Sequence, residues 1–320
     1  MEVGFLTPLG GLLALACLIP LAVLALRERR ARRVRAALGL AQPRLTVHLP
    51  VASALVAVGG LLGLAAAQPV LETERTVLER TDAEAFVVFD VSRSMLAARA
   101  DGAPRRIDRA RDEAERLRAA LPDVPVGILS LTDRLLPHLF PTPDRSVFRS
   151  TILKAVDIER PPPALFFSTR ATQLGELGSI PKRGFFSPSA QKRLLIVLTD
   201  GESQPVEGTL QSEFASGRPA IETVYVHLWR RGERIWVGGV PERGYSPDAT
   251  SRPTLERVAE LTGGRVFEEG DAVAADAARA ALGEGPTRER VLDGERSALM
   301  PYAAALVLLP LGFLLLRRNL

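Results

Sequence analysis

The sequence predicts an α/β protein: a domain with a mainly parallel central sheet and helices on both faces, joined to three transmembrane helices. Two observations lead to this prediction. Between residues 84 and 282, short apolar runs alternate with amphipathic segments, as buried parallel strands alternate with the helices that connect them. Three other blocks of the chain are long, apolar and almost free of charge, as bilayer-spanning segments are.

The composition limits the possible classes of protein. The chain has 320 residues, of which 47% are hydrophobic and 24% charged. Outside the apolar blocks, about 200 residues remain, enough for one domain with a single core. Much of the net charge of +4 sits in one short loop, so we do not interpret it as nucleic-acid binding. Cys17 is the only cysteine, which excludes an internal disulfide.

The first apolar block, residues 3–26, is predicted to be transmembrane helix 1. Pro8 and Pro20 could kink this helix, which membrane helices tolerate. A cleaved signal peptide is the alternative interpretation. It is disfavoured because Glu2 is the only early charge and the arginines follow the block instead of preceding it.

Two further blocks are predicted to cross the membrane. Residues 49–70 form transmembrane helix 2, in which Gly59, Gly60 and Gly63 could let another helix approach closely. Residues 298–316 form transmembrane helix 3.

Basic residues beside these blocks predict the topology. Residues 27–48 form an arginine-rich loop, and residues 317–320 form a tail with two arginines. By the positive-inside rule, both segments are expected in the cytoplasm. The domain between the second and third spans is then expected outside the cytoplasm.

The soluble part is expected to follow a stalk, residues 71–83, that is extended or helical. Apolar runs predict strands over residues 84–90, 126–131, 135–140, 193–199, 221–229 and 265–268, with 234–240 extending the fifth as a hairpin. Periodic apolar residues and caps predict helices over residues 105–121, 144–156 and 254–261, and a closing helix after Asp271. Gly263 is expected to end the third helix, and residues 283–297 to form a linker.

The stretch from Phe86 to Ser94 supplies the first part of a candidate site. Residues 86–89 form the continuous apolar run of a strand buried on both faces, and Asp90, Ser92 and Ser94 follow directly. In open α/β sheets, ligands bind in the crevice beyond the carboxyl ends of the strands. We therefore expect one carboxylate and two hydroxyls to face that crevice.

Two other segments are expected to complete the site: Thr172, in T-R-A-T-Q-L-G-E-L, and Asp200, in V-L-T-D-G-E-S. Asp90 and Asp200 would face each other, and two unpaired carboxylates at ~4 Å repel by roughly 4 kcal/mol at an effective dielectric constant near 20. A divalent cation removes that penalty. Because all donors are oxygens, the pattern favours a hard ion such as Mg²⁺, with Mn²⁺ and Ca²⁺ as alternatives, over Zn²⁺.

The apolar strand followed by D-x-S-x-S resembles the metal-ion-dependent adhesion site (MIDAS) of von Willebrand factor A (VWA) domains. T-x-L-G-E-L and L-T-D-G-E-S are similar to the second and third motifs of that site, and T-L-E-R-V-A-E-L-T-G-G-R-V-F to the family's closing helix and strand. The resemblance covers residues 84–282 and implies a Rossmann-like VWA domain. One departure is Ala171, where family members often have glycine; Ser168 or Thr169 could substitute for Thr172.

The VWA resemblance also implies a role for each residue. Ser92, Ser94 and Thr172 would bind the metal directly, and Asp90 and Asp200 would mainly hold its water molecules. With few anions around it, the metal keeps affinity for one more. In VWA domains that ligand is often an Asp or Glu of a partner protein, so the resemblance implies a protein-binding module and not an enzyme.

The apolar blocks and the opening P-L-G-G-L-L-A-L-A-C-L-I-P-L look like those of the bacterial aerotolerance-related (Bat) membrane proteins. This resemblance implies a multi-pass protein of the bacterial inner membrane, in an envelope or stress-related complex with similar VWA proteins. It also implies a functional link to a MoxR-type AAA+ ATPase. Such an ATPase is cytoplasmic, so under the predicted topology it could contact only the loop at 27–48 or the tail at 317–320.

Two other functions stay open. One is a metal-dependent hydrolase that uses Asp90 and Asp200, as phosphatases of the haloacid-dehalogenase type use two aspartates. Their acid/base aspartate follows the nucleophile by two positions, where this chain has Ser92, which cannot transfer protons at neutral pH. The scattered His48, His138 and His227 form no Ser/His/Asp set, and no Gly-rich phosphate loop is present. The other is a structural membrane scaffold with a vestigial metal site.

A Pro-rich insertion at residues 160–193 surrounds Thr172. It contains two aromatic pairs, Phe166-Phe167 and Phe185-Phe186. Our hypothesis is that one pair is exposed beside the metal and anchors a partner. The alternative is that both pairs fill the core.

Overall fold

The structure is a computed structural model that describes residues 2–41, 49–160, 172–206 and 209–318. The chain divides into two compact units. One contains Met1–Arg75 and Val291–Leu320, and the other contains Thr76–Arg290.

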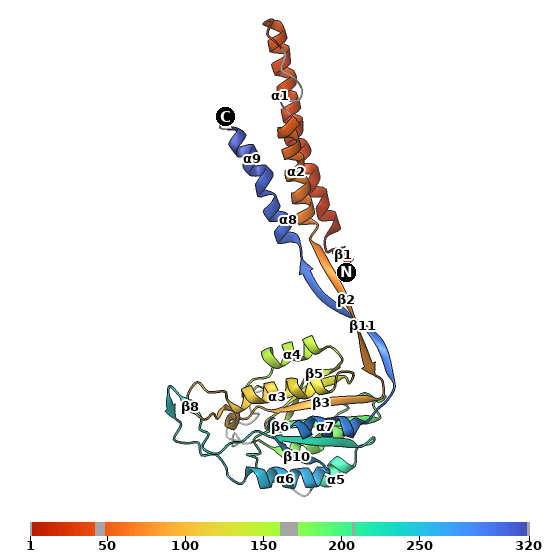
Figure 1. The fold of residues 1–320 in the computed structure, drawn as a ribbon, viewed down its shortest axis with the longest axis vertical. Helices are drawn as coiled ribbons and strands as arrows, with labels where there is room; N and C mark the ends of the chain where they lie inside the picture. The colour runs from red at the N-terminus through yellow and green to blue at the C-terminus, as the bar shows by residue number, and fades with distance from the viewer. Residues whose placement is uncertain (1, 42–48, 161–171, 207–208, 319–320) are drawn as a thin grey trace. The chain divides into compact units, whose positions relative to one another are not determined.

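The second unit is built on a six-stranded sheet with the order β10-β7-β6-β3-β4-β5 (Figure 1). The strands are β3 Ala83–Asp90, β4 Val126–Leu131, β5 Leu135–Thr142, β6 Lys192–Thr199, β7 Ile221–His227 and β10 Arg265–Glu268. All neighbours are parallel except β5, which runs antiparallel to β4 at one edge. The predicted fold class, a mainly parallel sheet, is confirmed.

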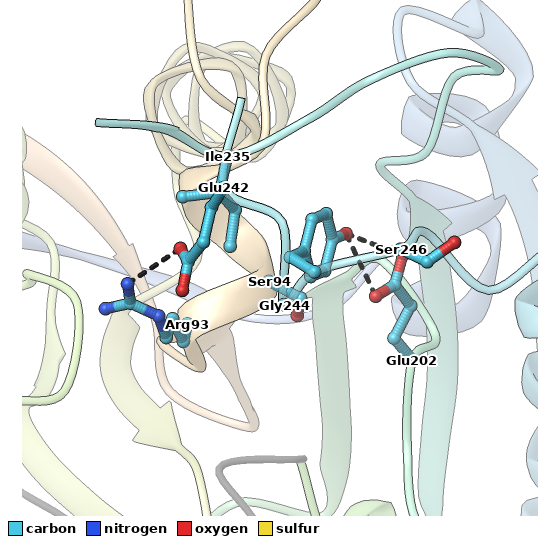
Figure 2. A pocket seen from close by; sticks show the side chains of 8 residues that line it. Arg93, Ser94, Glu202, Ile235, Glu242, Gly244 and Ser246 are labelled. Carbon is cyan, nitrogen blue, oxygen red and sulfur yellow. Dashed lines mark hydrogen bonds and ion pairs between the residues drawn. The ribbon is translucent and has the colours of Figure 1, made fainter. Parts of the chain in front are cut away.

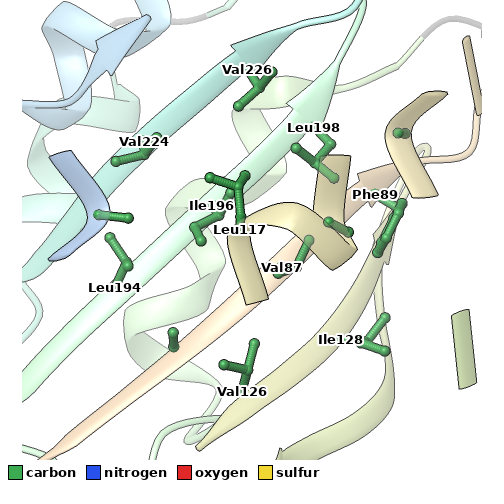
Figure 3. Close-up of a cluster of buried hydrophobic side chains, with 14 of the residues drawn as sticks. Val87, Phe89, Leu117, Val126, Ile128, Leu194, Ile196, Leu198, Val224 and Val226 are labelled. Carbon is green, nitrogen blue, oxygen red and sulfur yellow. The ribbon is translucent and has the colours of Figure 1, made fainter. Parts of the chain in front are cut away.

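The middle parts of the two central strands, residues 85–89 and 194–198, are apolar because both faces of the sheet are covered. On one face, Val87 of β3 and Ile196 of β6 lie side by side in a cluster with residues of the covering helices (Figure 3). On the other face, Phe86 and Leu195 are equally buried in a second cluster. Burying a side chain of this size stabilises the fold by about 1.5–3 kcal/mol.

Three helices cover each face. The first face packs against α3 Arg106–Ala120, α4 Arg145–Lys154 and α7 Ala272–Leu282. The second packs against η4 Leu174–Lys182, a 3₁₀ helix, with α5 Thr209–Ala215 and α6 Ser251–Thr262. Figure 1 shows α3 and α4 on one side of the sheet and α5 and α6 on the other.

The predicted capping residues lie at the starts and ends of these helices. The Asp144 carboxylate accepts hydrogen bonds from the backbone of Ser146 and Val147 at the start of α4, and Asp271 caps α7 in the same way. Gly263 ends α6 in the left-handed conformation, with φ of +72°.

Most of the segments predicted as a stalk (71–83) and a linker (283–297) is strand. β2 (Pro69–Arg80) and β11 (Thr287–Ala298) form a three-stranded sheet with β1 (Glu2–Phe5), in the order β1-β2-β11. Within the second unit, the buried Glu79 carboxylate forms ion pairs at 2.9 Å with Arg288 and with Arg290. The charged residues of β2 and β11 therefore pair with each other across the two strands.

The prediction that residues 234–240 form a hairpin with the strand at 221–229 was wrong. β7 ends at His227, and β8 (Trp236–Val237) and β9 (Val240–Pro241) form a separate two-stranded sheet. They belong to a long loop, residues 228–250, between β7 and α6, which we call the 228–250 loop.

Among the described residues of the first unit, three helical segments are long and apolar enough to cross a membrane: Pro8–Ala37, Leu49–Ala66 and Met300–Arg317. They consist of η1 Pro8–Cys17 with α1 Leu18–Ala37, of α2 Leu49–Ala66, and of α8 Met300–Leu306 with α9 Leu308–Arg318. Two details differ from the expectation. The basic segment is helical as far as Ala37, and the first residues pair as β1 with β2.

Glycines of α2 permit close packing against η1, as predicted. A Cβ atom added at Gly59 would lie 2.4 Å from Cys17 Cβ, and one added at Gly63 would lie 2.7 Å from Ala14 Cβ. At Gly60 an added Cβ meets no atom within 4 Å. Two of the three glycines therefore lie at the helix contact.

Candidate metal centre

Asp90 lies at the carboxyl end of β3 and is fully buried. Its Oδ1 accepts a hydrogen bond from the backbone N–H of Ser92 at 2.9 Å, and its Oδ2 accepts one from the Thr199 hydroxyl at 2.6 Å. The hydroxyls of Ser92 and Ser94 lie 2.9 Å apart. The D-x-S-x-S motif thus gathers one carboxylate and two hydroxyls at the strand end, as expected.

Thr172 reaches the same place from a distant part of the chain. Its hydroxyl lies 2.9 Å from both carboxylate oxygens of Asp90. Its carbonyl oxygen accepts hydrogen bonds from the Ser203 hydroxyl and the Gln204 backbone, both at 2.9 Å, so the position of Thr172 is held by the turn after β6. Ala171, Ser168 and Thr169 lie outside the described residues.

Asp200 follows β6, which pairs in parallel with β3, so the ends of the two strands meet. Its carboxylate is buried and engaged on both oxygens. Oδ1 accepts from the backbone of Glu202 at 2.9 Å, and Oδ2 accepts from the Arg106 guanidinium at 2.7 Å. The predicted pair of unpaired aspartates is therefore corrected, because Asp200 has a buried cationic partner.

Arg106 is a residue of the site that we did not predict from the sequence. Its side chain is fully buried at the start of α3. Besides Asp200, it donates hydrogen bonds to Glu202 at 2.9 Å, to Glu233 at 2.7 Å and to the Tyr245 hydroxyl at 3.0 Å. A signal was present, because Arg106 shares the helical spacing of the buried residues Ala110 and Leu117.

The 228–250 loop is tied to this centre through charged and polar side chains. Glu233 is fully buried and also forms an ion pair with Arg109 at 2.7 Å. Tyr245 donates its hydroxyl to the Glu202 carboxylate at 3.0 Å. Glu202, in the motif L-T-D-G-E-S, thus connects the loop to the end of β6.

The centre carries more negative than positive charge. Five carboxyl groups (Asp90, Asp200, Glu202, Glu233 and Glu269) face three guanidinium groups (Arg106, Arg109 and Arg230), so carboxyl groups outnumber guanidinium groups by two. Burial, with the charge of Asp200, raises the pKa of Asp90 to about 7. Burial and Asp200 also raise the pKa of Glu202, which Arg106 opposes. The free energy of the buried charges therefore favours an added cation.

The donors suit a hard divalent ion. Among the residues that the structure describes, no three or more His, Cys, Asp or Glu side chains form a group that could hold a metal ion. A metal here would depend on the hydroxyls of Ser92, Ser94 and Thr172 together with Asp90 and Asp200. This all-oxygen set fits Mg²⁺ better than Zn²⁺.

A pocket of about 400 Å³ opens beside the centre (Figure 2). Ser94 lines it together with Arg93, Glu202, Ile235, Glu242, Gly244, Tyr245 and Ser246. Ser94 is 9% exposed, whereas none of the other four predicted ligand residues exceeds 1%. A ligand would therefore approach the centre past Ser94.

The aromatic-anchor hypothesis is not supported for Phe185 and Phe186. Both are buried and pack on Phe86, with ring centroids 6.1 and 5.1 Å away. Phe166 and Phe167 lie outside the described residues. The pair at 185–186 fills the core, which was the alternative interpretation.

The histidines take structural positions. His227 is buried and lies within hydrogen-bond distance of the Asp200 carbonyl oxygen and the Ser251 hydroxyl. His138 pairs with the Ser130 hydroxyl at 2.8 Å. His48 is outside the part of the chain that the structure describes.

Comparison with known proteins identifies structural relatives only. No protein-family model matches the chain, and no curated protein matches it. The conserved hypothetical protein BatB from Bacteroides thetaiotaomicron is 19% identical with a TM-score of 0.49, over 62% of this chain and 97% of that one. An aerotolerance-related membrane protein from Bacteroides fragilis is 20% identical with a TM-score of 0.48, over 62% and 98%.

The chain is similar in structure to Bat-type proteins. It is also similar to a von Willebrand factor type A protein from Catenulispora acidiphila, which is 15% identical with a TM-score of 0.39, over 66% of this chain and 49% of that one.

Proposed function

We propose that this chain is a membrane-anchored, Bat-type VWA module that binds a divalent cation and, through it, a partner protein. Asp90, Ser92, Ser94, Thr172 and Asp200 would hold the ion. Mg²⁺ is the proposed ion, with Mn²⁺ or Ca²⁺ as alternatives. When bound, it would supply a positive centre that accepts an Asp or Glu carboxylate from the partner.

The observation that carries this proposal is that carboxyl groups outnumber guanidinium groups by two beside the hydroxyls of Ser92, Ser94 and Thr172. Buried carboxylates without enough cationic partners are unfavourable, and a divalent cation would favour the ionised form of all of them. Hydroxyl donors compensate little of the ion's charge, so an acidic ligand remains attractive to it.

Binding is favoured over hydrolysis because both aspartates are already engaged. Asp90 accepts hydrogen bonds from Ser92, Thr172 and Thr199. Asp200 accepts from Arg106 and Glu202. A catalytic nucleophile or base must reach a reacting atom, and these carboxylates are held inside the protein instead.

The proposed setting is the bacterial inner membrane. Arginines follow the first apolar segment and end the third, so the positive-inside rule places them in the cytoplasm and residues 76–290 outside it. Other VWA membrane proteins are proposed partners. A MoxR-type ATPase is a proposed functional link that, in the cytoplasm, could reach only the basic segments.

Thermal melting of the full chain in detergent, with Mg²⁺ or with EDTA, tests the metal site. A ligand at a hundred times its Kd stabilises the folded state by about 2.7 kcal/mol. We expect Mg²⁺ to raise the Tm of the wild type and not of the variant that combines Asp90→Asn with Ser92→Ala. Identical melting of the wild type in Mg²⁺ and EDTA would contradict the proposal and favour a scaffold with a vestigial site.

Crosslinking in native membranes tests the partner. The wild type should capture a partner that the Asp90→Ala, Ser92→Ala variant loses, and a mutation of the partner's acidic residue should abolish the same crosslink. Equal capture by both forms of the chain would argue against a metal-bridged contact. Phosphatase or protease activity that disappears in the Asp90→Ala variant would instead support the hydrolase alternative.

A further inference from the structure

Arg106 brings a permanent positive charge into the candidate metal centre. Its Nη1 lies 2.7 Å from Asp200 Oδ2 and 3.4 Å from the carbonyl oxygen of Ser94. Arg106 thus contacts two of the five residues proposed to hold the cation. A guanidinium group stays charged throughout the pH range in which proteins fold.

Glu233 is the buried counter-charge of Arg106 from the 228–250 loop. Its Oε2 accepts from Arg106 Nε at 2.7 Å, and its Oε1 lies 2.7 Å from Arg109 Nη2. The other side-chain hydrogen bond described for Glu233 comes from the backbone of Arg230. Glu233 therefore acts on Arg106 without contacting the proposed ligands in the described part of the chain.

Given the metal site proposed above, we propose that Arg106 is a positioning residue that acts through Asp200 to lower the affinity of the site for its cation. Glu233 limits this effect by neutralising Arg106. The affinity of the site for its cation is therefore lower than it would be without Arg106.

The reason is electrostatic. Arg106 and a divalent cation compete for the Asp200 carboxylate, and they repel each other in a buried site where charges are poorly screened. A neutral residue in place of Arg106 removes one positive charge from beside Asp200, so the site would hold the cation more tightly. A neutral residue in place of Glu233 removes one negative charge from beside Arg106, so the site would hold the cation less tightly.

A purely structural role for Arg106 makes the opposite prediction. If Arg106 only fixes Asp200 and the 228–250 loop in place, its removal loosens the centre and weakens cation binding. The direction of the change in affinity therefore separates the two roles, whatever the loss of stability.

Isothermal titration calorimetry with Mg²⁺ on the full chain in detergent tests the proposal. We expect Arg106→Gln to lower the Kd for Mg²⁺ by about tenfold or more and Glu233→Gln to raise it by about fivefold or more, as expected for like and unlike charges near an ion in a poorly solvated site. Arg106→Lys keeps a positive charge but not the bonding geometry of the guanidinium, so it should lower the Kd less than Arg106→Gln does.

Arg118→Gln is the matched control. Arg118 is also a buried arginine of α3, but it bonds the carbonyl oxygens of Leu121 and Pro143, away from the centre. Its replacement should lower the Tm and leave the Kd for Mg²⁺ unchanged. Circular dichroism on every variant shows that the titrated protein is folded.

An equal or higher Kd in Arg106→Gln would overturn the inference, as would an unchanged Kd in Glu233→Gln. The second variant decides the matter if the first is not recovered folded. A wild-type chain that gives no Mg²⁺ binding signal would overturn the metal site itself, together with this inference. The two failures are thus distinguishable.

Discussion

The hydroxyl of Thr172 lies 2.9 Å from both carboxylate oxygens of Asp90, although 82 residues separate the two in the sequence. Both side chains are fully buried. The contact brings Thr172 to the end of β3, beside the D-x-S-x-S motif.

Thr172→Val should abolish the Mg²⁺-dependent rise in Tm, because valine keeps the shape and removes the hydroxyl. The variant should also lose about 1–2 kcal/mol of stability without metal, since Asp90 loses one donor. Thr223→Val is the control, because the buried Thr223 hydroxyl bonds Thr262 away from the centre. A full Mg²⁺ response in Thr172→Val, measured by melting in both conditions, would exclude Thr172 as a ligand.

Phe186→Ala should destabilise the second unit, Thr76–Arg290, by about 3–5 kcal/mol, as expected for removal of a buried phenylalanine side chain. The ring of Phe186 meets that of Phe86 edge to face at 5.1 Å. Phe140→Ala is the matched control, because Phe140 is 59% exposed on the edge strand β5, and it should change stability by less than about 0.5 kcal/mol. Denaturant unfolding measures both, and equal effects would contradict the core assignment of Phe186.

The free energy of unfolding of the second unit, Thr76–Arg290, should fall on acidification partly because of His138. Burial lowers the pKa of this imidazole, so between its folded and unfolded pKa values the unfolded chain binds more protons. The contribution is complete above the unfolded value, near 6.5, and is lost as the pH falls through the lowered folded value.

A His138→Gln variant provides the measurement. Gln does not titrate, so the variant should lose less stability than the wild type between about pH 7.5 and pH 5, a window set by the ordinary histidine pKa. Denaturant midpoints at the two pH values give the comparison. Equal losses in the two proteins would show that His138 does not contribute to the pH dependence.

Gly59→Ala should disturb the packing of α2 against η1, whereas Gly60→Ala should not. The new methyl at position 59 would meet Cys17 Cβ at 2.4 Å, but at position 60 it meets no atom within 4 Å. Overpacking of this kind costs about 1–3 kcal/mol. The Tm of the two variants in detergent checks this difference, and indistinguishable values would contradict the helix contact.

Several features were predictable because their signals are local. The apolar runs of β3 and β6 indicated strands buried on both faces, and the residues that follow them, Asp90 and Asp200, lie at the same edge of the sheet. Asp144, Asp271 and Gly263 marked helix ends within a turn of where they act. Each cap joins residues a few positions apart, and each strand is marked by a continuous run of apolar residues.

Other features needed the tertiary structure. The segments at 71–83 and 283–297 were predicted as a stalk and a linker, and only the structure shows that they include the paired strands β2 and β11, with Glu79 bonded to Arg288 and Arg290. Arg106 had the spacing of a buried helix face, but no residue near it in the sequence indicates which groups it would bond. Asp200 and Glu233 lie 94 and 127 residues away.

The sequence by itself therefore determined the three apolar spans, the central strands and the oxygen donors that follow those strands. The tertiary structure alone decided that a buried arginine shares Asp200 with any bound cation and that the 228–250 loop supplies its counter-charge. The physical reason is that hydrophobic periodicity and capping depend on neighbours in the chain, whereas the balance of buried charge depends on which distant groups the fold brings together.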